Sequence, residues 1–175
     1  MMKQKILFPV LVAALTFAPV LPVARAATYA NGTATATFNV TLTLQANCSI
    51  SATPLNFGTN GVLATALNQQ TNVGVTCTNT TPYNVGLDGG TVAGSTVTGR
   101  LMAGTATGNA GTTVGFQLYQ DAGRATVWGN TQGTNTVAGT GTGSAQTIPI
   151  YGQVPAQATP KPDTYQTTVT ATVYF

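Results

Sequence analysis

The most restrictive feature of the sequence is a strict alternation of side-chain types over residues 33–44. Every even-numbered residue in this stretch is apolar, and every odd-numbered residue is Thr or Asn. Because successive side chains of a β-strand point to opposite faces, the pattern predicts an extended strand with one apolar face and one polar face. Residues 165–175 also alternate apolar side chains with Thr. The two segments together indicate a fold made of strands.

Shorter alternating segments lie between these two and are separated by Gly, Asn, Asp and Pro, which are typical of turns. The chain is rich in the strand formers Thr and Val, and it contains no Glu. About seven or eight short strands with this spacing predict an all-β fold, an immunoglobulin-like β-sandwich. The expected inner strands are 54–58, 73–77, 83–87, 97–102, 114–118, 125–128 and 148–150, with a long loop or poorly ordered hairpin at 129–144.

The first 26 residues have the organisation of a secretory signal peptide. Lys3 and Lys5 precede an apolar run over residues 6–23, and Ala24-Arg25-Ala26 forms a small-x-small cleavage site. A membrane anchor is the alternative, but the run contains three prolines and is shorter than the roughly 20 apolar residues that a spanning helix needs. We therefore expect a cleaved signal peptide over 1–26 and an exported protein without stable membrane insertion.

Removal of the signal peptide changes the charge of the protein. The whole sequence has a formal net charge of +3, but three of its six cationic residues lie within residues 1–26. The remaining Arg100, Arg124 and Lys161 are balanced by three aspartates. A nucleic-acid-binding protein needs clustered Lys and Arg, and the mature chain has no such cluster, so we expect no nucleic-acid partner. A nearly uncharged surface favours assembly, because charge repulsion keeps soluble proteins apart.

Cys48 and Cys77 are the only cysteines in the sequence. In an exported protein a single pair is expected to form a disulfide. A metal site is the alternative, but the sequence offers no His and no third thiol to complete one. A bridge closing a loop of this length stabilises a fold by about 3–4 kcal/mol in the chain-entropy model.

Residues able to support catalysis are scarce. The chain has no His or Glu, and no activating partner for a Ser or Thr nucleophile can be identified. Asp88 and Asp121 lie in Gly-containing segments, where Asp is a common turn residue. We therefore expect neither enzymatic activity nor a cofactor or metal. Trp128, Tyr119 and Tyr151 are a candidate sugar-binding platform, although isolated aromatic residues in a sandwich more often belong to the core.

The two terminal segments suggest how the protein assembles. An apolar edge strand is normally protected by charged residues or proline, and residues 165–175 contain neither. The N-terminal strand either completes its own domain or is added to a neighbouring subunit. In the second case the side chains that fill a groove of the neighbour are Ala34, Ala36, Phe38, Val40 and Leu42. The residues of the terminal strand expected at that groove are Val169, Ala171, Val173, Tyr174 and Phe175.

Several segments, taken in order, resemble the spore coat protein U domain family, to which subunits of archaic chaperone–usher pili belong. They are Cys48 after an alternating strand, then 55–58, 75–77, 85–90, 116–119 with Asp121, 148–152 and the terminal 165–175. The resemblance implies an incomplete immunoglobulin-like fold that is completed by donor-strand complementation. It also implies a periplasmic chaperone that binds the final strand and the carboxylate of Phe175, and an outer-membrane usher at which subunits polymerise.

These observations predict a signal peptide at 1–26, an N-terminal extension and donor strand at 27–44, and a spore coat protein U-type pilin domain at 45–175. The donor boundary is open, because residues 29–40 could be donated while 41–48 pair within their own subunit. The predicted function is a structural subunit of a cell-surface pilus, polymerising with neighbouring subunits and supporting attachment and biofilm formation. The alternatives are a secreted coat-like structural protein and a glycan-binding adhesin of the same fold.

Overall fold

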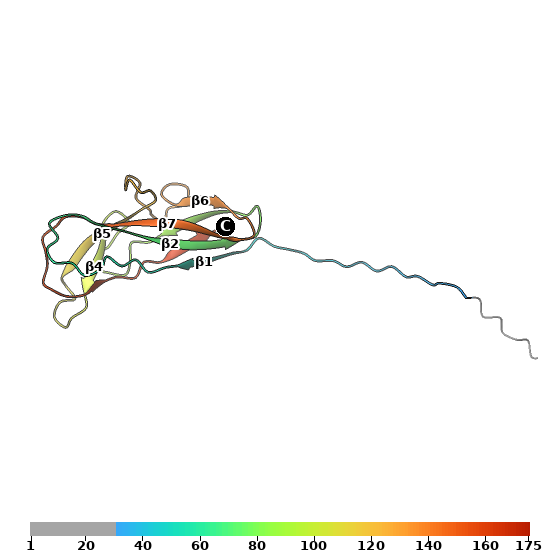
Figure 1. Cartoon of the computed structure of the whole chain (residues 1–175), viewed down its shortest axis with the longest axis horizontal. Coiled ribbons are helices and arrows are strands. Elements are labelled where there is room, and N and C mark those ends of the chain that lie inside the picture. Colours follow the sequence, from blue (N-terminus) through green and yellow to red (C-terminus); the bar gives the residue numbers. More distant parts are fainter. Residues whose placement is uncertain (1–30) are drawn as a thin grey trace, which may run out of the picture. The chain divides into compact units, whose positions relative to one another are not determined.

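The computed structural model describes residues 31–175, so the expected signal peptide at 1–26 lies outside the described residues. Within residues 31–175 every regular element is a β-strand, which confirms the all-β fold (Figure 1). The strands are β1 (Cys48–Ala52), β2 (Leu67–Cys77), β3 (Pro82–Leu87), β4 (Arg100–Gly104), β5 (Thr113–Tyr119), β6 (Val137–Thr140), β7 (Ala145–Val154), β8 (Tyr165–Gln166) and β9 (Ala171–Tyr174). This part of the chain contains no helix that is long and apolar enough to cross a membrane.

The strands form two antiparallel sheets, as expected for an incomplete immunoglobulin-like sandwich. The larger sheet has the order β1-β2-β7-β5-β4-β8, and the smaller has the order β6-β3-β9. The longest ladder joins β2 to β7, which run side by side along the sandwich, through ten register pairs (Figure 1). On its other side β2 is paired with β1 through five register pairs.

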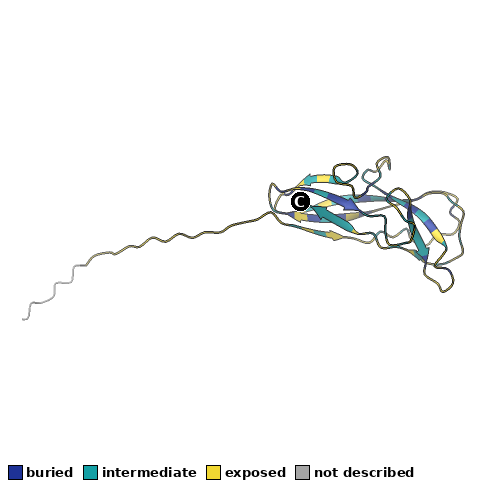
Figure 2. Ribbon diagram, turned by 180° about the vertical axis from the view of Figure 1, so that it is seen from behind, coloured by how far each residue is buried: buried dark blue, intermediate teal, exposed yellow. Residues whose placement is uncertain are grey.

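Alternate residues of the strands form the core between the two sheets. Residues coloured as buried lie mainly within the strands (Figure 2). The alternation that predicted strands at 73–77, 83–87 and 114–118 is the pattern by which these strands bury their side chains. The buried side chains of β2, β3 and β5 are Thr71, Val73, Val75, Cys77, Tyr83, Val85, Leu87, Val114, Phe116 and Leu118.

Two expected strands are wrong. Residues 54–58 form no strand, because Pro54 has no N–H to donate and Gly58 has a left-handed φ of 77°. The side chain of Asn56 accepts the N–H of Gly58 at 2.8 Å and closes a local turn. Residues 125–128 contribute only a single bridge. Leu55, Phe57 and Trp128 of these two segments still pack in the core. The apolar alternation therefore predicted their burial correctly, but it predicted strand pairing wrongly.

The Gly- and Thr-rich region 129–144 contains a strand that the sequence pattern did not predict. This strand, β6, pairs with β3 from Pro82↔Thr140 to Val85↔Val137. Its burial is slight, and backbone hydrogen bonds to β3 define it. The periodicity of apolar residues therefore could not predict β6.

The two terminal segments have different structures. Residues 165–175 do not form the single expected strand: β8 joins β4 in the larger sheet, β9 joins β3 in the smaller, and 167–170 cross between them. Residues 31–46 belong to no strand in the described part of the chain. Residues 41–48 were expected to pair within their own subunit, but only two of them do. Cys48 pairs with β2, and the carbonyl oxygen of Asn47 accepts the N–H of Thr78.

Candidate functional site

Two free strand edges face each other on one side of the sandwich. β1 is an edge of the larger sheet and β9 an edge of the smaller; no ladder joins them, although their Cα atoms approach within 8 Å. Cys48, at the start of β1, lies opposite Cys77 at the end of β2. Tyr174, at the end of β9, lies opposite Asn84, shortly after the turn at 78–81. β1 therefore runs away from this turn and β9 runs toward it, so a strand between them is parallel to one and antiparallel to the other.

Beyond β1 the space between these edges opens into two adjoining cavities, at the end of the sandwich opposite the turn at 78–81. The inner cavity, of about 410 Å³, lies between residues 52–57 and 165–171. The outer cavity, of about 630 Å³, lies between residues 55–63 and 159–165. Leu55, Phe57, Met102 and Tyr165 line both cavities. We call the whole space between β1 and β9, with both cavities, the groove.

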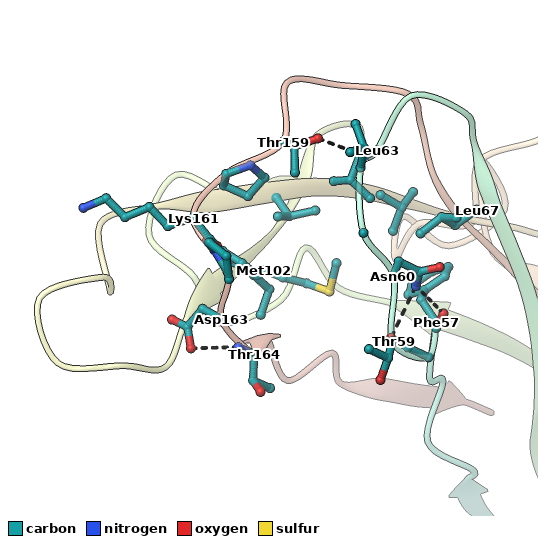
Figure 3. Close-up of a pocket in the computed structure, with 18 of the residues that line it drawn as sticks. Phe57, Thr59, Asn60, Leu63, Leu67, Met102, Thr159, Lys161, Asp163 and Thr164 are labelled. Carbon is teal, nitrogen blue, oxygen red and sulfur yellow. Dashed lines mark hydrogen bonds between the residues drawn. The ribbon is translucent and has the colours of Figure 1, made fainter.

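Core side chains form the floor of the groove. Those of the inner cavity are Leu87, Phe116, Leu118 and Ile150. Those of the outer cavity are Leu63, Val114 and Val154. Figure 3 shows Met102 pointing into the outer cavity between Phe57 on one wall and Asp163 on the other. The groove is thus an opening into the hydrophobic core rather than a depression in a polar surface.

The terminal strand places alternate side chains along the groove. Val169 and Ala171 line the inner cavity, and Val173 packs against the core nearer the turn at 78–81. Tyr174 lies on the other face of β9, where its hydroxyl is 3.5 Å from the carbonyl oxygen of Asn130. Phe175 is 61% exposed. Of the five residues expected at the groove, Val169, Ala171 and Val173 therefore lie along it. Tyr174 and Phe175 do not.

Asp88 fixes the start of β9 against β3. Its carboxylate accepts the N–H of Thr170 and the N–H of Gly90, both at 2.9 Å, and its own N–H donates to the carbonyl oxygen of Thr170 at 3.1 Å. Partial burial opposes ionisation, but these hydrogen bonds and the charge of Arg100 outweigh it, so the pKa of Asp88 lies below its ordinary value. At neutral pH the ionised carboxylate holds this wall of the groove in place.

Arg100 is fully buried beneath the same wall. Its guanidinium donates to the carbonyl oxygens of Leu87 (2.9 Å), Asp88 (2.9 Å), Val97 (3.0 Å) and Trp128 (2.7 Å), and to the side chain of Gln117. Burial lowers the pKa of Arg100 to about 10, partly offset by the charge of Asp88, so the side chain remains cationic at neutral pH. Sequence reasoning counted Arg100 only as a charge, because nothing in its neighbourhood distinguishes a buried arginine from an exposed one.

Asp163 fixes the outer wall of the outer cavity. Its carboxylate accepts the side-chain amide of Asn109 at 2.6 Å, the N–H of Ala106 at 3.0 Å and the N–H of Thr164 at 2.7 Å. The hydrogen bond from Asn109 is the main cause of a pKa for Asp163 below its ordinary value, reinforced by that from Ala106. Residues 159–165 are thereby tied to the loop at 105–112.

Residues 31–47, which we call the arm, contain the strict alternation of residues 33–44. The side chains of Phe38, Val40, Leu42 and Leu44 are 85, 86, 80 and 79% exposed. Single exposed apolar residues are ordinary, but four at every second position form a continuous apolar face. That face has no strand partner within residues 31–175.

The predicted disulfide between Cys48 and Cys77 is present, and it lies where the arm joins β1. Beside it, the N–H of Asn47 donates to the hydroxyl of Thr78 at 2.9 Å, and the N–H of Thr78 donates to the carbonyl oxygen of Asn47 at 2.9 Å. The Thr78 hydroxyl is also 2.8 Å from that of Thr81. Sequence reasoning missed Thr78, since one Thr among many carries no signal.

The candidate sugar-binding platform is wrong. Trp128 is fully buried, and its indole N–H donates to the carbonyl oxygen of Val85 at 2.8 Å. Tyr119 and Tyr151 lie opposite each other on β5 and β7, without the indole beside them on the surface. Asp121 is the expected turn residue, because its carboxylate accepts the N–H of Thr126 at 2.8 Å. Within residues 31–175, no group of three or more His, Cys, Asp or Glu side chains is placed to hold a metal ion.

Comparison with known proteins adds a family and a fold. A model of the Spore Coat Protein U domain family matches residues 34–172. No curated protein matches the chain. A similar solved chain comes from the crystal structure of the CsuC–CsuE chaperone–tip adhesion subunit pre-assembly complex, from the archaic chaperone–usher Csu pili of Acinetobacter baumannii.

The likeness to that structure concerns the fold. The TM-score is 0.52 at 23% sequence identity, and the match covers 76% of the present chain. It covers 40% of the other chain, so the present protein spans less than half of that chain's length.

Proposed function

Because the chain belongs to the Spore Coat Protein U domain family, we propose that it is a structural subunit of a bacterial surface pilus of the archaic chaperone–usher type. The observation that carries this proposal is that one chain holds both an exposed apolar arm and an apolar groove between two free strand edges. The arm of one subunit enters the groove of the next and completes its sandwich by strand addition. Such head-to-tail contacts between unlike surfaces generate a filament when they do not close into a ring.

The arm supplies enough apolar surface for a durable contact. Burial of its four large apolar side chains contributes roughly 6–12 kcal/mol before the cost of ordering the arm. Backbone hydrogen bonds to the free edges of β1 and β9 add directionality. The core side chains on the groove floor are covered at the same time. Assembly in this scheme needs no nucleotide, and the role of the protein is structural rather than enzymatic.

Side-chain size determines the orientation of the arm in the groove. The arm begins with small apolar residues, Ala34 and Ala36, and ends with large ones, Leu42 and Leu44. The groove is narrow beside the turn at 78–81 and wide at its two cavities. An arm parallel to β1 and antiparallel to β9 places the leucines at the cavities and the alanines at the narrow end. In the reverse orientation the small side chains of Ala34 and Ala36 would lie at the cavities and would not fill them.

The position of Cys48 favours the same orientation. Cys48 begins β1 beside the turn at 78–81, so each subunit sends out its arm from that end. In the proposed orientation the neighbour's arm emerges at the opposite end, beyond the outer cavity. Each subunit therefore gives its arm at one end and receives an arm at the other, which builds a linear filament. The reverse orientation would bring two neighbours to the same end.

Insertion requires β1 and β9 to separate. A strand hydrogen-bonded on both sides places its two neighbours about 9–10 Å apart. The Cα atoms of β1 and β9 approach within 8 Å, which is too close. We infer that a periplasmic chaperone holds the edges apart before assembly, by binding β9 and the carboxylate of Phe175, and that an outer-membrane usher exchanges it for an arm. The finished pilus supports attachment and biofilm formation at the cell surface.

Deletion of residues 27–44 tests the proposal. The full chain, co-expressed with its chaperone and usher, is expected to form fibres visible by electron microscopy, and the deletion variant is expected to form none. A peptide of residues 33–44 should raise the melting temperature of the deletion variant, whereas a control peptide with Phe38→Asp and Leu42→Asp should not. If the deletion variant is a stable monomer indifferent to the peptide and the full chain never forms fibres, the proposal is wrong.

A further inference from the structure

We propose that the Cys48–Cys77 disulfide, with Thr78 beside it, carries tension between successive subunits directly into β2. The inference rests on the proposed function, because tension reaches Cys48 only if the arm is anchored in a neighbouring subunit. Each subunit of a loaded filament is then pulled at its arm from one end and at its groove from the other. The junction of arm and domain is therefore a mechanical joint.

Without the disulfide, β1 is a weak anchor for this joint. It is an edge strand with five register pairs to β2 and no ladder on its other side. The chain after Ala52 forms no strand until Leu67, so it adds no further ladder. Because the arm enters β1 at Cys48, a pull directed away from the domain acts along β1 and loads its short ladder in shear.

The disulfide transfers the load to a stronger element. Cys77 is the last residue of β2, which lies inside the larger sheet and has ten register pairs with β7. Cys48 and Cys77 are direct register partners, so the bridge joins the end of the arm to the end of β2 without any intervening chain that could extend. Tension that enters at Cys48 then bypasses β1 and the connection at 53–66.

Thr78 holds the last residue of the arm beside the bridge. Its hydroxyl accepts the N–H of Asn47 and its own N–H donates to the carbonyl oxygen of Asn47, so the arm is held one residue before the bridge. The hydroxyl is in turn positioned by Thr81. A pull on the arm therefore acts on this hydrogen-bonded pair and on the bridge together, next to the end of β2.

β1 is also one wall of the groove, so the joint affects the neighbouring contact too. If β1 slides along β2, the free edge that holds the incoming arm is lost. A subunit without the disulfide would then yield at its outgoing arm and lose one of the two edges that hold the incoming arm, after the failure of one short ladder. The bridge protects the outgoing and the incoming contact together.

Stretching assembled fibres before and after reduction tests the inference. Fibres of the full oxidised chain are pulled between a surface and a cantilever, then treated with a phosphine reductant, with the extent of reduction measured by mass spectrometry. The rupture force is expected to fall by about half, in the proportion of five ladder pairs to ten. Each reduced subunit should lengthen by up to about 65 Å before rupture, because the chain from Cys48 to the start of β2 at Leu67 spans 19 residues and each extended residue spans about 3.3–3.6 Å.

Two variants refine the test, and Cys48→Ala/Cys77→Ala repeats it without reductant if that protein folds. Thr78→Val retains the bridge and should lower the rupture force slightly without lengthening. Thr76→Val, at an exposed position near the end of β2, is the matched control and should change neither quantity. Unchanged rupture force and length after complete reduction would overturn the inference. Failure of the oxidised full chain to form fibres would instead reject the proposed function.

Discussion

The arm and the terminal segment 165–175 share a sequence pattern but occupy opposite situations in the molecule. Both alternate apolar residues with Thr. The terminal segment is divided between two sheets and largely half-buried, whereas the large apolar side chains of the arm are about four-fifths exposed. Alternation therefore specifies an extended conformation and two faces, while the partner of a segment is specified by residues elsewhere in the chain. For β9 that partner is the edge of β3 together with Asp88; the arm finds none in the described chain.

An aspartate placed in each segment should separate the two roles most strongly. Val173→Asp puts an unpaired charge against the core, and we expect a loss of about 3 kcal/mol or more in the free energy of unfolding. Phe38→Asp changes an exposed side chain, so the stability of the domain should change by less than about 0.5 kcal/mol while fibres disappear. Urea unfolding and electron microscopy measure the two effects. Equal destabilisation by both substitutions would remove the distinction between the segments.

A smaller effect should come from side-chain size along the arm. Leu42→Ala leaves an apolar cavity in the proposed contact, and we expect that contact to weaken by about 2–3 kcal/mol. Ala36→Leu adds volume at the narrow end of the groove and should weaken it by about 1–3 kcal/mol. The urea concentration that dissolves assembled fibres measures both. Thr76→Ala, an exposed position on β2 that lines neither cavity of the groove, serves as control. If Ala36→Leu strengthened the fibres, the proposed orientation of the arm would be reversed.

The attachment of β9 should be weakened by loss of the Asp88 side chain. Asp88→Ala removes the acceptor for the N–H groups of Thr170 and Gly90, and we expect a loss of about 1–2 kcal/mol after allowance for solvent screening. Amide hydrogen exchange should increase over 168–174 more than over β2 or β7. Asp88→Asn, which keeps an acceptor oxygen, should retain part of the protection. Uniform exchange across the domain would mean that Asp88 supports the whole fold rather than the wall of the groove.

Sequence patterns were sufficient where periodicity and burial coincide. Val73, Val75 and Cys77 alternate because β2 turns one face to the core, so strand, face and disulfide could all be predicted. The pattern also identified the arm and the terminal segment as segments with an apolar face, although the arm lies in no strand of residues 31–175 and the terminal segment is divided between β8 and β9. It did not reveal that 167–170 cross between sheets, although Thr167 interrupts the apolar positions of the alternation at this point.

What could not be predicted depends on partners distant in sequence. β6 exists through its backbone bonds to β3, Trp128 is enclosed by strands from both sheets, and Thr78 matters only because Asn47 lies beside it. None of these contacts can be recognised from the residues that neighbour each position in the sequence. The floor of the groove is of this kind, since it combines side chains from strands that lie far apart in the sequence.

Acid should weaken the attachment of β9 and leave the arm unchanged. This is the smallest of the expected effects. The pKa of Asp88 is lowered in the folded protein, so its ionised form stabilises the fold above the ordinary Asp pKa of about 4, and this contribution is lost as the pH falls through that region. The free energy of unfolding should therefore be flat from pH 7 to about 5 and decline below about 4.

The variant Asp88→Asn isolates the share of this decline that belongs to β9. Asp121 and Asp163 also have lowered pKa values, so the variant should show a shallower decline rather than none. Residues 31–47 contain no ionisable side chain, so acid should loosen the wall of the groove without altering the arm. Fibres brought below pH 4 should then release arms because the receiving edge is weakened. An identical pH profile for Asp88→Asn and the unmodified chain would place the acid sensitivity at Asp163 or Asp121 instead, away from β9.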